Sequence, residues 1–241
     1  MTKQKEEVNK LNRIKPATNI IFNLIFLILG LACVTPVILV FIISITKESE
    51  LVAHGYSFFP KVLSLSAYSY LWNERKSIGN ALLISALVTV LGTLIGLALT
   101  TTMGYVLSRS EYKLKGFFSW VVFIPMIFNG GMVANFLNLR NTIWCLILPL
   151  SVSSFNVIIS KTFFKSTIPD SIVESAKIDG ASEFTIFSRI IVPISKPVFA
   201  TIGLFLSFGY WNDWFQSSLY ISEKKLTSLQ ALLNNMIQNI Q

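Results

Sequence analysis

The sequence has few charged residues, few cysteines and almost no histidine. Charged residues make up 13% of its 241 residues, whereas a soluble globular protein has about 25%. The two cysteines, Cys33 and Cys145, lie far apart in apolar runs, which excludes a disulfide-bonded scaffold. Since His54 is the single histidine, the sequence predicts neither a metal site nor a Cys–His catalytic pair.

The phosphate-binding pattern G-x-x-x-x-G-K-[ST] is also absent from the sequence. We therefore expect no cofactor and no catalytic residue on this chain, and any ATP that it depends on must bind elsewhere. Lysine and arginine number 20 and acidic residues 12, which gives a net charge of +8. Because the basic residues form no stripe with interleaved aromatic residues, nucleic acid is not an expected partner.

Apolar residues are what the sequence has in abundance. They make up 53% of the chain, and the mean hydropathy is +0.62. In water such a chain would expose a large apolar surface and aggregate, and it is too hydrophobic for a disordered protein. The composition therefore indicates an integral membrane protein that contacts the lipid bilayer.

Long uncharged windows predict where the chain crosses the membrane. A transmembrane helix needs about 20 apolar residues, and closed barrels need an alternating pattern that is missing here. We expect an all-α, polytopic membrane protein with about five transmembrane helices, made of a segment 1–16 and a transmembrane domain 17–241. The five windows, of which the last contains one charge, are 17–46, 77–108, 116–139, 141–160 and 197–222.

Three features within these windows predict further details of the helices. Pro36 predicts a break or kink in the first window. Gly92 and Gly96 form a GxxxG pair in the second, which would let another helix approach closely, although the two glycines can also be incidental. The run Asn129–Gly131 predicts a loosened helix in the third.

The basic residues predict how the chain is oriented. With a cytoplasmic N-terminus and five spans, 13 of the 20 lysines and arginines lie on the cytoplasmic side. This bias has the sign of the positive-inside rule. We therefore expect a multi-pass protein of a bacterial-type cell membrane with its N-terminus in the cytoplasm.

The longest cytoplasmic connection, residues 161–196, has the pattern of a folded segment. Pro169 and Asp170 suit the start of a helix that runs to about Asp179. Gly180 can end that helix with a positive φ, and Ser182 can cap a second one. The sequence thus predicts two short helices joined at an angle.

The second of these helices has an apolar face that needs a cover. The protein's own membrane helices or a partner could supply it, and the sequence leaves both open. The face consists of Phe184, Phe187, Ile190 and Ile191.

Within this connection lies a motif that resembles the EAA signature of the membrane-spanning subunits of binding-protein-dependent ABC importers. The family pattern is Glu-Ala-Ala, three residues, Gly, nine residues, and Ile-x-Leu-Pro. The chain keeps every spacing, and its matching segments are Glu174-Ser175-Ala176, Asp179-Gly180-Ala181, and Ile190, Val192 and Pro193. Other stretches, including FIPMIFNGGM and YWNDWF, are similar to the carbohydrate, maltose-permease-like branch, and the resemblance covers about residues 17–232.

The resemblance implies a permease subunit that forms part of the path for a sugar or oligosaccharide. ATP would be used by a separate ATPase dimer that binds the EAA loop, and the other partners would be a second homologous permease and an extracellular solute-binding protein. For Glu174 and Asp179 the alternative is that they only complement helix ends. The implied coupling residues are Glu174, Ser175, Ala176, Asp179, Gly180, Ala181, Ile190 and Pro193.

A charge within an apolar window marks a candidate for the substrate path. Asp213 stands between Trp211 and Trp214 and follows Asn212. Aromatic faces beside amide and carboxylate groups suit sugar rings, but an interfacial aromatic belt with a hydrated acid has the same composition. Asn129 and Asn156 are weaker candidates.

One departure from the family bears on activity. Members of the family usually carry a sixth span after the segment that LTSLQALLNNMIQNIQ resembles, and this sequence stops at Gln241. We therefore keep a second hypothesis, a truncated, non-transporting remnant or a regulatory membrane subunit. A membrane-embedded enzyme acting on lipid is a third, and the lone His54 argues against it.

Overall fold

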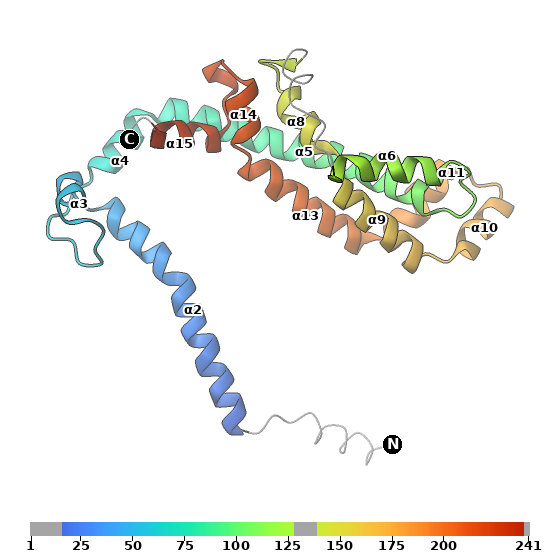
Figure 1. The fold of residues 1–241 in the computed structure, drawn as a ribbon, viewed down its shortest axis with the longest axis horizontal. Helices are drawn as coiled ribbons and strands as arrows, with labels where there is room; N and C mark the ends of the chain where they lie inside the picture. Colours follow the sequence, from blue (N-terminus) through green and yellow to red (C-terminus); the bar gives the residue numbers. More distant parts are fainter. Residues whose placement is uncertain (1–15, 128–138, 239–241) are drawn as a thin grey trace. The chain divides into compact units, whose positions relative to one another are not determined.

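The computed structural model describes residues 16–127 and 139–238, and the chain forms two compact units, Met1–Arg75 and Lys76–Gln241. Within the described residues the regular structure is helical, and β pairing is limited to one isolated bridge between Thr46 and Leu63. The expected all-α class is confirmed (Figure 1).

The first unit consists mainly of one long apolar helix. This helix, α2 (Pro16–Ser44), is followed by α3 (Glu48–His54) and α4 (Ser66–Asn73). Since α2 continues through Pro36, the break predicted there is wrong. An interior proline removes one backbone hydrogen bond. A break in an apolar run that lies in lipid would leave more backbone groups without a hydrogen-bond partner, so the helix continues.

The second unit begins with α5 (Arg75–Ser108), which starts at the boundary between the units. Short and medium helices follow it, several of them in bent pairs. They are α6 (Lys115–Ile127), α8 (Trp144–Ser151), α9 (Ser154–Thr167), α10 (Asp170–Ile178), α11 (Glu183–Thr185), the π-helix η1 (Ile186–Ile191), α12 (Val192–Ile194), α13 (Lys196–Asn212), α14 (Phe215–Tyr220), the 3₁₀ helix η2 (Lys224–Leu226) and α15 (Leu229–Gln238).

Glycines on α5 set the packing of the second unit. A Cβ added at Gly92 would overlap the ring of Tyr210 on α13, and one at Gly96 would lie 2.8 Å from the carbonyl oxygen of Ser151. Further along α5, a Cβ at Gly104 would overlap the Cβ of Ser160 on α9. The close approach predicted for the Gly92–Gly96 pair is therefore confirmed.

The core of the second unit lies where these helices meet. Ile84 and Val88 of α5 are buried in one cluster with Ile147 of α8 and Ile202 of α13. The hydroxyl of Tyr210 donates a hydrogen bond of 2.7 Å to the carbonyl of Ile147 and so links α13 to α8. This arrangement holds α5, α8, α9 and α13 as one bundle.

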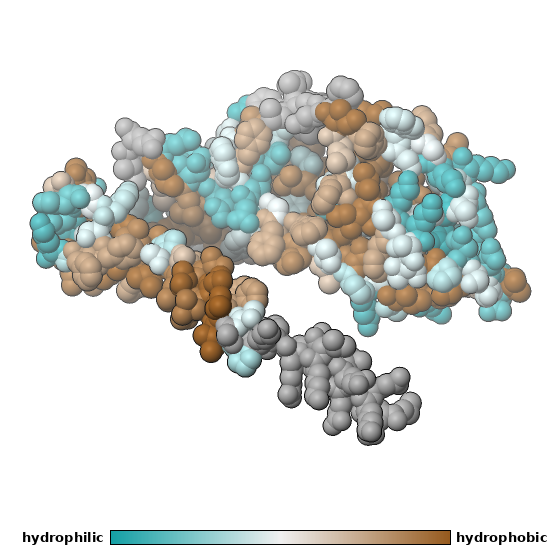
Figure 2. Space-filling view, turned by 60° about the horizontal axis from the view of Figure 1, so that its bottom comes forward, coloured by the Kyte–Doolittle hydropathy of each residue, from teal (hydrophilic) through white to brown (hydrophobic). Residues whose placement is uncertain are grey.

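The apolar helices fit a membrane. Among the described residues, α2 and α5 are each long and apolar enough to span it, and two bent pairs raise the possible number to four. No part of the most apolar window of α2 is buried, and its apolar side chains are visible in Figure 2. Because such a surface is stable only in hydrocarbon, the chain is a multi-pass membrane protein.

Three of the predicted windows differ in detail from the observed helices. The window 141–160 is divided into α8 and α9, which meet at 47°. The window 197–222 was predicted too long, because α13 ends at Asn212. In the window 116–139 the described helix is α6, and Asn129–Gly131 lie outside the described residues.

Candidate functional site

Residues 170–194, which we call the knob, fold as the sequence predicts. Asp170 begins α10 directly after Pro169, and Gly180 follows α10 with φ +80°. The N–H of Gly180 donates to the carbonyl of Lys177, and the N–H of Ala181 donates to that of Ala176, both at 3.0 Å. This pair of hydrogen bonds is the Schellman motif, which ends a helix and turns the chain sharply.

The second half of the knob starts with the predicted cap. The hydroxyl of Ser182 accepts a 3.3 Å hydrogen bond from the N–H of Thr185. A helical path then continues through η1 and α12 to Ile194. The π-helix between Ile186 and Ile191 was not expected, because an extra residue in one turn leaves no mark in the spacing of apolar residues.

Most of the implied coupling residues lie on the outside of the knob. Glu174 is the fifth of the nine residues of α10, so it does not complement a helix end. Ala176 is buried, and Ala181 and Ile190 are half-buried. The exposed members are Glu174, Ser175, Asp179, Gly180 and Pro193.

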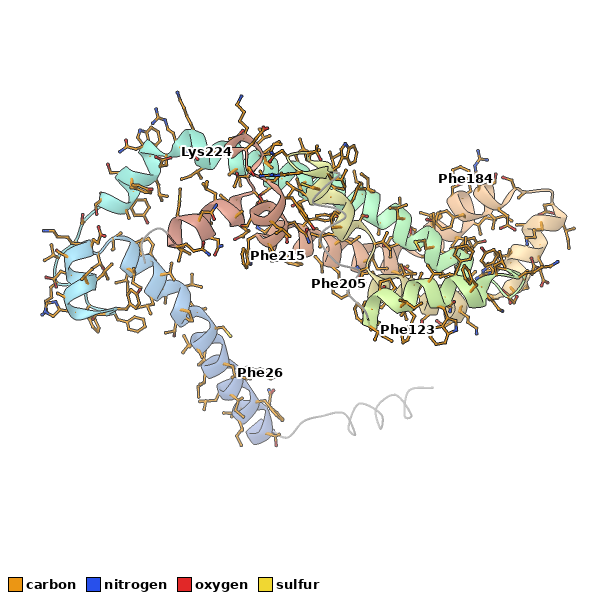
Figure 3. All side chains as sticks on the ribbon, turned by 45° about the horizontal axis from the view of Figure 1, so that its top comes forward. Phe26, Phe123, Phe184, Phe205, Phe215 and Lys224 are labelled. Carbon is orange, nitrogen blue, oxygen red and sulfur yellow. The ribbon has the colours of Figure 1, made fainter. Side chains whose placement is uncertain are left out.

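The apolar face of the second half is covered in part by the chain itself. Ile186 and Ile191 are fully buried in the core of the second unit, and Phe187 packs against it. Phe184 is 79% exposed (Figure 3), and Ile178 at the end of α10 is 86% exposed. Ile178 and Phe184, the two most exposed large apolar side chains of the knob, therefore remain available for a partner.

Charged side chains join the knob to residues 109–114, which we call the inner connection because they link α5 to α6. The ammonium group of Lys177 lies 2.6 Å from the carboxylate of Glu111 and 3.0 Å from that of Glu183. The hydrogen bond and charge of Lys177 lower the pKa of Glu111, and the two carboxylates raise the pKa of Lys177. Arg109 and Asp170 form a second ion pair at 3.2 Å.

Aromatic side chains join the same region to α5 and α9. The ring of Tyr105 on α5 lies 5.2 Å from that of Phe187 and 5.9 Å from that of Phe164 on α9. The guanidinium of Arg109 lies over Tyr105 at 5.1 Å from its centroid. Beside them is a cavity of about 510 Å³, lined by Thr102, Tyr105, Val106, Arg109, Glu111, Tyr112, Lys177, Glu183, Phe184 and Phe187.

Asp213 has a structural role in addition to any functional one. Its carboxylate accepts a hydrogen bond of 3.2 Å from the N–H of Gln216, and its carbonyl accepts one of 3.3 Å from the hydroxyl of Ser228. Asp213 thus ends α13 and caps the following turn, which explains why the helix stops there although the apolar window continues to residue 222. Trp211 and Asn212 are exposed beside it.

Of the other two candidates for the substrate path, the structure describes one. Asn156 is buried near the start of α9. Asn129 lies outside the described residues.

No protein-family profile matches the chain, but individual proteins do. It is 37% identical to Protein LplC of Bacillus subtilis over 237 residues, which is 94% of this chain and 77% of that protein. It is 38% identical over 216 residues to the polygalacturonan/rhamnogalacturonan transport system permease protein YtcP of B. subtilis, which is 88% of this chain and 75% of that protein.

A solved structure agrees with these relatives. The crystal structure of a bacterial ABC transporter involved in the import of the acidic polysaccharide alginate superposes with a TM-score of 0.80 at 26% identity, over 95% of this chain and 84% of that one. The chain belongs to the permease subunits of ABC importers. The resemblance to the carbohydrate branch of this family is thereby confirmed.

Sequence reasoning did not find the ion pairs of this permease. Lys177 and Glu111 are 66 residues apart, and Arg109 and Asp170 are 61 residues apart. No local pattern relates opposite charges at such a distance. In the sequence, Lys177 is only a basic residue near the end of a predicted helix. The favourable interaction of a cation with the helix dipole accounts for a lysine there without an ion-pair partner.

Proposed function

We propose that this permease forms part of the path by which an oligosaccharide is imported across a bacterial cell membrane, and that a separate ATPase dimer drives it through the knob. A second, homologous permease would complete the path, and an extracellular binding protein would deliver the substrate. The observation that carries the proposal is a knob closed by a Schellman motif, with an exposed face, on a chain related to importer permeases.

The composition of the exposed face suits a protein partner. Ile178 and Phe184 offer apolar area, and Glu174 and Asp179 offer negative charge to basic residues of an ATPase. The small side chain of Ser175 lets a partner approach this face closely. Contact with a partner would remove both exposed apolar side chains from water, which favours association.

The length of α5 supports a cytoplasmic position of the knob. This helix has 34 residues, about 51 Å at 1.5 Å per residue, so its two ends lie on opposite sides of a ~30 Å hydrocarbon layer. If the N-terminus is cytoplasmic, α2 leads the chain out and α5 leads it back to Arg109. Because Arg109 pairs with Asp170, the knob lies on that inner side.

Basic residues near the opposite end of α5 support an acidic substrate. The side-chain amide of Asn80 donates a 2.8 Å hydrogen bond to the carbonyl of Lys225, and Arg140 donates one of 2.8 Å to the hydroxyl of Ser222. These contacts gather basic residues near the start of α5. The exposed cations of this group, which we call the outer basic group, are Lys76, Arg140, Lys224 and Lys225.

Two relatives are named for acidic polysaccharides. YtcP is named for polygalacturonan and rhamnogalacturonan, and the transporter of known structure for the import of alginate. Uronate carboxylates would be attracted to the outer basic group, because a cluster of one sign raises the local concentration of the opposite charge. We therefore take an acidic oligosaccharide as the substrate class.

Co-purification tests the proposed function. The tagged chain is expressed with its genomic neighbours, extracted in detergent and isolated, and we expect an ATPase and a second permease in fixed stoichiometry. Addition of a binding protein loaded with substrate is expected to raise the ATPase activity. Isolation of the chain alone, after it has inserted into the membrane, would contradict this function and favour a non-transporting remnant.

A further inference from the structure

We propose that Lys177 is a positioning residue that fixes the knob to the inner connection, so that α5 and α6 move with the knob. This inference rests on the proposed function, because it assumes that an ATPase acts on the knob. The geometry that carries it is a set of ion pairs between α10 and residues 109–111.

The two ion pairs hold opposite ends of one short helix. Asp170 is the first residue of α10 and pairs with Arg109, whereas Lys177 is in its last turn and pairs with Glu111. Seven residues of helix separate them by about 10 Å. One contact would act as a pivot, but two contacts at this separation prevent α10 from rotating relative to the inner connection.

Lys177 also connects the two halves of the knob. Its second carboxylate partner, Glu183, is the first residue of α11, which lies beyond the turn at Gly180. One ammonium group therefore binds α10, α11 and the inner connection together.

From the inner connection a rigid route leads into the membrane helices. Arg109 follows the last residue of α5 and lies over the ring of Tyr105. Tyr105 packs against Phe187 of the knob and Phe164 of α9. A displacement of the knob is therefore transmitted to α5 through both charged and aromatic contacts.

The test measures transport and ATP hydrolysis in the same assembly. The full complex is reconstituted in proteoliposomes, and the number of substrate molecules imported per ATP hydrolysed is determined. For Lys177→Met and for Glu111→Gln we expect this ratio to fall about fivefold, at the lower end of typical coupling between sites. The matched control is Lys113→Met, an exposed lysine of the same connection, which should keep the wild-type ratio.

The double variant tests whether the two residues act through their contact. If they do, Lys177→Met combined with Glu111→Gln also lowers the ratio about fivefold, because the second change removes nothing further. A fall of about 25-fold would mean independent effects and would overturn the proposal. A wild-type ratio in both single variants would overturn it too. Glu111 is 62% exposed, so its variant is informative even if Lys177→Met folds poorly.

A second readout separates coupling from mere stability. Spin labels at positions 113 and 171, in a Cys33→Ser background, report the distance between the inner connection and the knob. The label on the knob is placed at the exposed Ser171 of α10 and not at Ile178, because Ile178 belongs to the face proposed to contact the ATPase. We expect that distance to stay constant on ATP binding in the otherwise unchanged protein and to change in Lys177→Met. The same change with and without Lys177 would contradict the proposal.

Failure of this inference can be told apart from failure of the proposed function. If Gly180→Val lowers the transport ratio while Lys177→Met does not, the knob couples but the ion pairs do not transmit its motion. If both variants keep the wild-type ratio, the knob itself is not the coupling element.

Discussion

Single residues of the knob show how local chemistry fixes its shape. Gly180 has φ +80°, and an added Cβ would meet no other atom within 4 Å. Its conformation, rather than any lack of space, is therefore what requires glycine there. For most other residues the left-handed conformation costs about 1–2 kcal/mol, but asparagine adopts it more easily.

Replacement of Gly180 should uncouple ATP hydrolysis from transport. In Gly180→Val the chain avoids the positive φ, so the hydrogen bonds that close α10 are lost and the knob no longer fits its partner. We expect normal insertion into the membrane and a reduced ratio of substrate imported to ATP hydrolysed, measured in proteoliposomes. Gly180→Asn is the control and should stay close to wild type. Equal ratios in all three proteins would show that the turn is dispensable.

At the scale of secondary structure elements, the glycines of α5 determine which helices can meet. A Cβ at Gly104 would overlap the side chain of Ser160 and lie 3.0–3.1 Å from backbone atoms of α9, which cannot rotate away. A Cβ at Gly79, in the same helix, would have no atom within 4 Å. The two positions therefore differ in packing but share the same helical conformation.

This difference predicts opposite results for the same substitution. Gly104→Ala should force α5 and α9 apart and destabilise the second unit by roughly 1–3 kcal/mol, as overpacking does. Gly79→Ala should be neutral or stabilising, since alanine has the higher helix propensity. Thermal unfolding in detergent measures both. A melting temperature for Gly104→Ala at or above that of Gly79→Ala would mean that the two helices are not closely packed.

At the scale of the whole molecule, charge is distributed between the two ends of α5. The knob end carries ion pairs that hold parts of the protein together, and the other end carries the exposed lysines of the outer basic group, Lys76, Lys224 and Lys225. Exposed charges of one sign act mainly by attracting an opposite charge from a distance, and salt weakens that effect. Any effect of the outer basic group on substrate uptake should therefore depend on the charge of the substrate and on the ionic strength.

The substrate class can be tested through this dependence. In the variant Lys224→Gln/Lys225→Gln we expect uptake of an oligogalacturonate at low salt to fall several-fold, and the difference from wild type to shrink as salt is added. Uptake of a neutral oligosaccharide of the same length, and uptake by the control Lys61→Gln, should not change in this way. Preference for the neutral sugar in the wild-type protein would refute an acidic substrate.

The sequence by itself determined the features that depend on neighbouring residues. Apolar runs longer than a bilayer made the chain an all-α membrane protein, and Pro169, Gly180 and Ser182 defined the two helices of the knob. The motif around Glu174 identified the family, which the relatives confirm. Such features can be read from the sequence because backbone conformation and transfer into lipid are decided within a few residues.

The tertiary structure decided which distant groups meet. Only packing showed that Lys177 pairs with Glu111 and that Gly104 touches Ser160. It also showed that Asp213 ends α13 and caps the next turn. The predicted fifth span, which continued to Ser222, is therefore ten residues longer at its end than the observed helix, which ends at Asn212. These contacts join residues whose separation in the sequence carries no information about their separation in space, since the fold alone brings them together.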